Sequence, residues 1–182
     1  MSTAENKTVR FPNVPDGGTF RVAGMEFIKF PTVNGRTPVV TRKPVFNSRF
    51  GDNNDLRSSD VLKRLQEEIL PKITTEVGEE NVLTFQTDLT TLDGLKPYGV
   101  MESKISLYTL DFYREHVETF DKYPVNDYCW TATPESAQPH DDPYWVVCVS
   151  PAGCIDNGGI CGNGAVRPFL IFDSSIFESS EE

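Results

Sequence analysis

Histidine and cysteine, the residues from which most zinc and redox sites are built, are scarce in this chain. Its two histidines, His116 and His140, lie far apart, and none of its four cysteines forms a C-x-x-C pair. Zinc ribbons and thioredoxin-like redox sites need that spacing. We therefore expect no metal, no cofactor and no catalytic residue. We interpret the cysteines as free thiols that are buried as small hydrophobic side chains.

Positive charge is also in short supply. The chain has 17 lysines and arginines against 27 acidic residues, which gives a formal net charge of −10. Its densest basic group contains only Arg36, Arg42 and Lys43. A nucleic-acid surface needs clustered basic side chains to displace counterions. Nucleic acid and anionic membranes are therefore not expected as partners.

Long apolar runs are absent too. No segment approaches the roughly 20 apolar residues of a transmembrane helix, so we expect no membrane insertion. The first residues, 1–7, are polar and lack the apolar stretch of a secretory signal peptide. We expect synthesis in a host cytoplasm, with release to the outside only inside a particle freed by lysis.

Turn-forming residues are plentiful, with 13 glycines and 13 prolines. They favour short strands over long helices, and the order of elements predicts an α+β fold with an antiparallel sheet. We expect a polar N-terminal arm (residues 1–16), a single domain (17–173) and an acidic tail (174–182). The expected strands lie at 19–30 (two, around a turn at Ala23-Gly24), 39–46, 104–107, 128–133, 144–149 and 166–172, and Asn34-Gly35 is expected to form a second turn.

Two helices are expected between these strands. The first covers residues 60–70, with Ser58 or Ser59 as its cap and Pro71 as its end. The second follows Thr109, which caps it. Helical spacing places four apolar side chains on one face of the second helix: Leu110, Tyr113, Val117 and Phe120.

Two segments in the last third resemble a known family. Residues 128–134 (YCWTATP) are similar to a W-W-L-R-S-P motif, and residues 165–172 (AVRPFLIF) are similar to a G-V-R-P-A-L motif. Both motifs occur in a family of bacterial and phage domains with the C-type-lectin-like fold of the formylglycine-generating enzyme group. Weaker similarity at residues 59–66 and 105–113 extends the resemblance over most of the chain.

The chain departs from the family pattern at three positions. Tyr128 replaces the first Trp, Ala132 replaces the Arg of R-S-P, and Leu65 replaces a helix Trp. The polar contacts that the family makes at these points are therefore not carried over.

The resemblance implies a C-type-lectin-like fold with short antiparallel strands, two helices and a loop-rich C-terminal half. Members serve mainly as ligand-display domains, and several are targets of diversity-generating retroelements that vary the residues between the two motif strands. We therefore expect a non-enzymatic recognition module on a phage virion surface. Its expected partners are a protein or glycan on a host cell and other virion proteins, and self-association is left open.

The corresponding surface of this chain lies in residues 135–145 and 156–163. Strand alternation predicts that one of Tyr144 and Trp145 faces the core and the other faces solvent. Asp156-Asn-Gly-Gly and Gly162-Asn-Gly are interpreted as tight turns. The candidate ligand-binding residues are Glu135, Gln138, His140, Asp141, Asp142, Tyr144, Trp145, Asp156, Asn157, Ile160 and Asn163.

Two further residues are interpreted as structural. Trp130 is expected in the core. Arg167 lies between apolar neighbours, where an unpaired charge is costly, so a carboxylate or backbone carbonyls should meet it. We favour a structural ion pair over a catalytic role. The aspartates nearby in sequence are Asp127, Asp156 and Asp173, and the sequence does not select one of them.

Two alternative functions remain. One is a structural virion accessory, such as a head-decoration or tail-fibre component, whose arm and tail pack against neighbours. The other is a copper-dependent oxidase related to formylglycine-generating enzyme, in which copper is held by two cysteines. Cys154 and Cys161 are the only close pair for that role.

Overall fold

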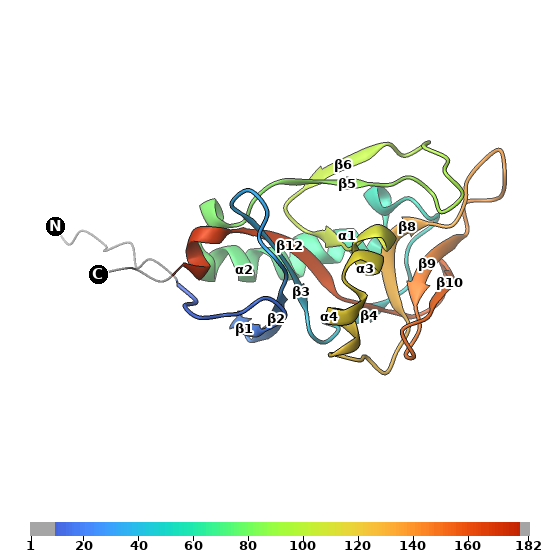
Figure 1. The fold of residues 1–182 in the computed structure, drawn as a ribbon. Coiled ribbons are helices and arrows are strands. Elements are labelled where there is room, and N and C mark those ends of the chain that lie inside the picture. Colours follow the sequence, from blue (N-terminus) through green and yellow to red (C-terminus); the bar gives the residue numbers. More distant parts are fainter. Residues whose placement is uncertain (1–9, 179–182) are drawn as a thin grey trace.

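The computed structural model describes residues 10–178, and its strands form two five-stranded sheets and one hairpin (Figure 1). Every neighbouring pair in the first sheet is antiparallel. Its strand order is β1 (Thr19–Val22), β2 (Met25–Lys29), β3 (Arg36–Thr41), β12 (Pro168–Asp173) and β7 (Ser106–Leu107).

The second sheet contains β8 (Cys129–Pro134), the strand of the first motif, and β11 (Gly164–Val166), which includes the start of the second motif. The rest of the second motif lies in β12 of the first sheet. One of its pairs, β8 with β11, is parallel, and the others are antiparallel. The order is β10 (Ile155–Gly159), β9 (Trp145–Val149), β8 (Cys129–Pro134), β11 (Gly164–Val166) and β4 (Phe46–Ser48). The hairpin consists of β5 (Phe85–Asp88) and β6 (Val100–Ser103). The α+β class is confirmed.

The N-terminal hairpins follow from local turn chemistry. Ala23 and Gly24 have φ angles of 51° and 77°, and Asn34 and Gly35 have 51° and 74°. Two successive positive φ angles produce the turn that best matches the twist of paired strands. The two predicted turns are therefore confirmed. The strand predicted at 39–46 is instead divided between β3 and β4.

The first predicted helix is longer than expected. It begins as predicted at Ser59, whose hydroxyl accepts a hydrogen bond from Leu62 N at 2.9 Å. It does not end at Pro71, and that prediction was wrong. A π-helical turn precedes the proline, and a proline is tolerated in the first turn after such an interruption because its missing N–H is not needed there. The segments are α1 (Asp60–Arg64), the π turn η2 (Leu65–Ile69) and α2 (Leu70–Val77).

The second predicted helix is broken into two. The Thr109 hydroxyl caps it as expected, accepting a hydrogen bond from Phe112 N at 3.1 Å. The break at His116 turns Val117 outward, so that this side chain is 39% exposed and the prediction for it was wrong. The two parts are α3 (Leu110–Glu115) and α4 (Val117–Asp121). Residues 10–178 also contain three 3₁₀ helices: η1 (Leu56–Ser58), η3 (Glu79–Asn81) and η4 (Ser174–Phe177).

Strand β12 divides the interior into two clusters. Leu170 and Phe172 contribute to the larger core against α1 and α2, whereas Phe169 belongs to an aromatic cluster that includes Tyr108 and Phe120. Successive side chains of a strand point to opposite faces, which explains this division. Residues 165–172 therefore contribute to both clusters.

The two ends of the described chain lie side by side. Phe11 N donates a hydrogen bond to Ile176 O at 2.6 Å, and Ile176 is buried. Packing therefore extends beyond both expected domain boundaries, while residues 1–9 and 179–182 of the expected arm and tail lie outside the described residues. The sheet of β8, β9 and β10 lies at the other end of the molecule (Figure 1). No helix within residues 10–178 has the length and apolar character to cross a membrane.

Candidate recognition surface

Trp130 joins the two motif strands. Its side chain is 3% exposed, as expected for a core residue, and its Nε1 donates to Ser48 O at 2.9 Å. The indole lies directly on two glycines: a Cβ at Gly164 would be 2.3 Å from Nε1, and one at Gly158 would be 2.9 Å from Cζ3. The tryptophan on β8 therefore requires glycine on both β11 and β10.

The segment predicted as a tight turn at residues 156–159 is a strand. It forms β10, which pairs with β9 from Ile155 opposite Val149 to Gly159 opposite Trp145. Its glycines serve close packing rather than turning, since a Cβ at Gly159 would lie 2.7 Å from a ring carbon of Tyr144. The turn prediction was wrong because contacts with distant rings, rather than local backbone needs, require these glycines.

Tyr144 and Trp145 are both exposed, at 38% and 39%. The prediction that one of them faces the core was wrong. Their rings pack edge to face with centroids 4.8 Å apart, and Tyr144 precedes β9 while Trp145 is its first residue. Because the strand begins only at Trp145, alternation along the strand does not determine the direction of these two side chains. The pair forms an exposed aromatic platform at the loop end of the sheet.

Asn54, which the sequence analysis missed, fixes both ends of the loop at 135–144. The residue is fully buried, and its Nδ2 donates to Ser136 O at 2.8 Å and to Trp145 O at 3.1 Å. Its Oδ1 accepts a hydrogen bond from Tyr98 at 2.6 Å. The loop is therefore attached to the domain at both of its ends through one side chain.

Asp93, also missed, attaches the middle of the same loop. Its carboxylate accepts from Ser136 Oγ at 2.6 Å and from Thr91 Oγ1, and it lies 2.8 Å from His140 Nδ1. These hydrogen bonds hold the pKa of Asp93 far below its ordinary value, and the bond from Ser136 lowers it most. His140 is therefore engaged with a structural carboxylate.

A hydrogen bond between side chains joins the two predicted loop regions. Asn157 Nδ2 on β10 donates to Glu135 Oε1 at 2.8 Å. We define the recognition surface as Glu135, His140, Tyr144, Trp145 and Asn157. Other predicted residues surround it and are exposed: Gln138, Asp141, Asp142, Asp156 and Asn163.

Ile160 does not belong to this surface. Its side chain is only 7% exposed and lies in the main core. Its backbone N–H donates to Tyr144 O, and its carbonyl accepts from Phe50 N. The prediction that Ile160 contacts a ligand was therefore wrong, because the segment after β10 turns into the domain.

A groove of about 220 Å³ continues the recognition surface along the sheet. Asn157 lines it together with Asn163 and with Tyr128, which is 49% exposed. Trp130 and Gly164 also line it. Tyr128 was interpreted only as a departure from the family motif, and its position in the groove was missed.

Arg167 is buried without an ion pair among the described residues. Arg167 is 4% exposed. Its Nε donates to Thr41 O at 2.9 Å, and its guanidinium lies 5.4 Å from the ring centroid of Phe120. The favoured ion pair with Asp127, Asp156 or Asp173 was wrong, because a carbonyl and an aromatic face meet the charge instead. The expected contact with a backbone carbonyl is confirmed.

The four cysteines divide into two kinds. Cys129 and Cys148 are buried, and burial raises the pKa of each thiol to about 11. Cys154 and Cys161 are exposed, so the interpretation of all four as buried was wrong for these two. They flank the extended strand β10, which spans roughly 16 Å at ~3.3 Å per residue. That separation prevents them from holding one copper ion between them.

Metal ligands do not gather elsewhere in the described part of the chain. Residues 10–178 contain no group of three or more histidine, cysteine or acidic side chains arranged to hold an ion. The loop end of the second sheet instead presents a fixed surface of aromatic, amide and carboxylate groups.

Comparisons of the chain with models of known protein families, with curated proteins and with solved structures find no match.

Proposed function

We propose that this protein is a non-enzymatic recognition module that is displayed on a phage virion and binds a protein or glycan on a host cell. The observation that carries the proposal is the exposed platform of Tyr144 and Trp145 beside Glu135 and Asn157. Aromatic side chains supply contact area at a low cost in conformational entropy, and amide and carboxylate groups supply directed hydrogen bonds.

The surface is held in place before any ligand binds. Asn54 fixes both ends of the loop, and Asp93 holds Ser136 and His140. Ordering of loops is a main cost of association, so a surface that is already ordered binds more tightly for the same contacts. Few polar side chains of the loop have to move to meet a partner.

Scaffold and surface are separated along the chain. All six residues of β8 are buried, whereas residues 138–142 between β8 and β9 are exposed. Side chains in this loop can change without disturbing the core, which is the condition for a variable binding surface on a constant fold. The separation supports the role that the resemblance to display domains implies.

The C-type-lectin-like fold is part of the same proposal. Its support is the adjacency of the two family motifs, since β8 pairs with β11 at Cys129 and Ala165 and Trp130 packs on Gly164. Residues that lie 34 and 36 positions apart in the chain are thus in direct contact, which gives the spacing of the two motifs a structural reason.

A screen against immobilised glycans and host-cell surface proteins tests the proposal. The purified protein should bind a defined subset, and Trp145→Ala should remove that binding. Val33→Ala is the matched control, because Val33 is 63% exposed in the β2–β3 turn, distant in the fold from the recognition surface. Incorporation into virions without any Trp145-dependent binding would favour the structural accessory instead.

A further inference from the structure

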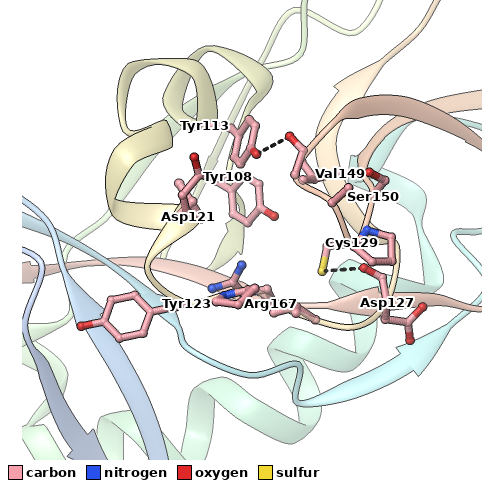
Figure 2. A pocket seen from close by; sticks show the side chains of 15 residues that line it. Tyr108, Tyr113, Asp121, Tyr123, Asp127, Cys129, Val149, Ser150 and Arg167 are labelled. Carbon is pink, nitrogen blue, oxygen red and sulfur yellow. Dashed lines mark hydrogen bonds between the residues drawn. The ribbon is translucent and has the colours of Figure 1, made fainter.

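A second cavity lies under helices α3 and α4, and no residue of the recognition surface lines it. Its volume is about 270 Å³. Figure 2 shows it between the helices, the β8 side chain Cys129 and the turn after β9. The ionisable side chains that line it include Tyr108, Tyr113, Asp121, Asp127, Cys129 and Arg167.

Two buried polar groups at this cavity have no hydrogen-bond partner among the described residues. They are Nη2 of Arg167 and the hydroxyl of Tyr108, in residues that are 4% and 1% exposed. Buried polar groups are nearly always paired, because an unpaired donor loses its hydration without compensation. Figure 2 shows the guanidinium and the phenol ring facing the same space. Both groups are therefore available to a bound molecule.

The charge of the cavity wall selects an anionic group. A guanidinium remains protonated at all relevant pH values, and a buried one is stabilised by an anion with good geometry. Arg167 uses Nε for Thr41 O, and its Nη2 has no partner among the described residues. Burial raises the pKa of Tyr108, so its hydroxyl stays protonated and acts as a donor. Carboxylates suit such a pair of donors.

The rim of the same cavity carries negative charge. Asp121 is exposed and lines the cavity. The carboxylate of Asp127 instead accepts hydrogen bonds from Asn47 Nδ2 and Tyr128 N. Gly153 lies against Asp121: a Cβ there would lie 3.3 Å from both Asp121 Oδ1 and Tyr113 Oη, and the tyrosine donates to Gly153 O at 2.7 Å. The Asp121 carboxylate at the rim disfavours multiply charged anions and favours a cationic group on the ligand.

We infer that this cavity binds a small zwitterion of amino-acid size, with its carboxylate on Arg167 and Tyr108 and its ammonium toward Asp121 at the rim. The size agrees with this class, because the cavity is smaller than the roughly 300–1,000 Å³ of sites for drug-sized ligands. The inference stands independently of ligand binding at Tyr144 and Trp145.

Calorimetric titration of the purified protein tests the inference, with four probes at matched ionic strength. L-alanine carries both charges, acetate only the carboxylate, methylammonium only the cation, and inorganic phosphate a multiple negative charge. Alanine should bind most tightly, acetate more weakly, and the other two not measurably. Tyr108→Phe should weaken alanine binding roughly tenfold, since it removes one hydrogen bond to a charged group.

The variants separate binding from folding. Tyr108→Phe deletes a hydroxyl without a partner, so its unfolding midpoint without ligand should be unchanged or raised. Asp121→Asn, at an exposed position, should weaken alanine binding and leave acetate binding unchanged. Equal affinity for alanine and acetate, or equal alanine affinity in wild type and Tyr108→Phe, would overturn the inference. The same holds if no probe binds, in which case buried water satisfies the two donors.

Discussion

The indole of Trp130 lies so close to Gly164 that a single methyl group on the glycine would overlap it, at 2.3 Å from Nε1. This contact connects the strand of the first motif with the strand of the second. The space between the ring and the backbone can be changed from either side by substitution.

Gly164→Ala should destabilise the protein by roughly 1–3 kcal/mol, the usual cost of overpacking a buried site. The ring must move, and its hydrogen bond to Ser48 O is then strained or lost. Denaturant unfolding measures the change. In a Trp130→Phe background the clashing part of the indole is gone, so the same substitution should cost clearly less. An equal cost in both backgrounds would show that the ring is not the cause.

Asn54→Ala should loosen the loop that carries the recognition surface. It removes two hydrogen bonds that hold the loop ends and one from Tyr98, at an expected cost of about 1–3 kcal/mol. Hydrogen exchange should accelerate in residues 136–145. Asn163→Ala, at an exposed position, is the control and should leave this exchange unchanged. Faster exchange spread evenly over both sheets would contradict a local role for Asn54.

Acid should release the attachment at Asp93. The pKa of this carboxylate is lowered in the folded protein, so its contribution to stability is present above the ordinary aspartate pKa of ~4 and is lost as the pH falls through the lowered value. The difference in unfolding free energy between wild type and Asp93→Asn should therefore be constant near neutral pH and shrink below about pH 4.

Asp141→Asn controls for a general effect of charge. Asp141 is exposed, and its side chain accepts a hydrogen bond only from the backbone N–H of Asp142. A difference for Asp93→Asn that stays constant down to strongly acidic pH would contradict the account.

The four thiols should react in two groups. Cys154 and Cys161 are exposed and should be alkylated rapidly in the native protein. Cys129 and Cys148 are buried with raised pKa values, so they should react only when the protein unfolds. Mass spectrometry after timed labelling distinguishes the groups. Native labelling of Cys129 at the rate of Cys154 would mean that the second sheet opens readily.

Local features of the fold could be predicted from the sequence. The turn at Asn34-Gly35 and the cap at Ser59 depend on residues that are neighbours in the chain, so pattern reasoning identified them. The end of the first helix could not be predicted in this way. Its continuation through Pro71 depends on a π turn whose sequence carries no comparable pattern.

The site was predictable in position but not in detail. The loop region was identified correctly as exposed, yet Asn54 and Asp93 hold it from 82 and 47 positions away. Nothing in the local sequence distinguishes Asn54 from the polar residues around it. Arg167 illustrates the same limit, since an apolar strand context predicted burial while its partners, Thr41 and Phe120, depend on the tertiary fold.

We propose that Tyr144 and Trp145 form the contact surface for a host-cell ligand, and affinity measurements on four proteins test this proposal. The ligand from the binding screen is titrated against wild type, Tyr144→Ala, Trp145→Ala and Val33→Ala. A buried aromatic anchor contributes about 2 kcal/mol or more, so each aromatic substitution should weaken binding by a factor of roughly 30 or greater. Val33→Ala should bind as wild type does. Equal affinity in all four proteins would contradict the account.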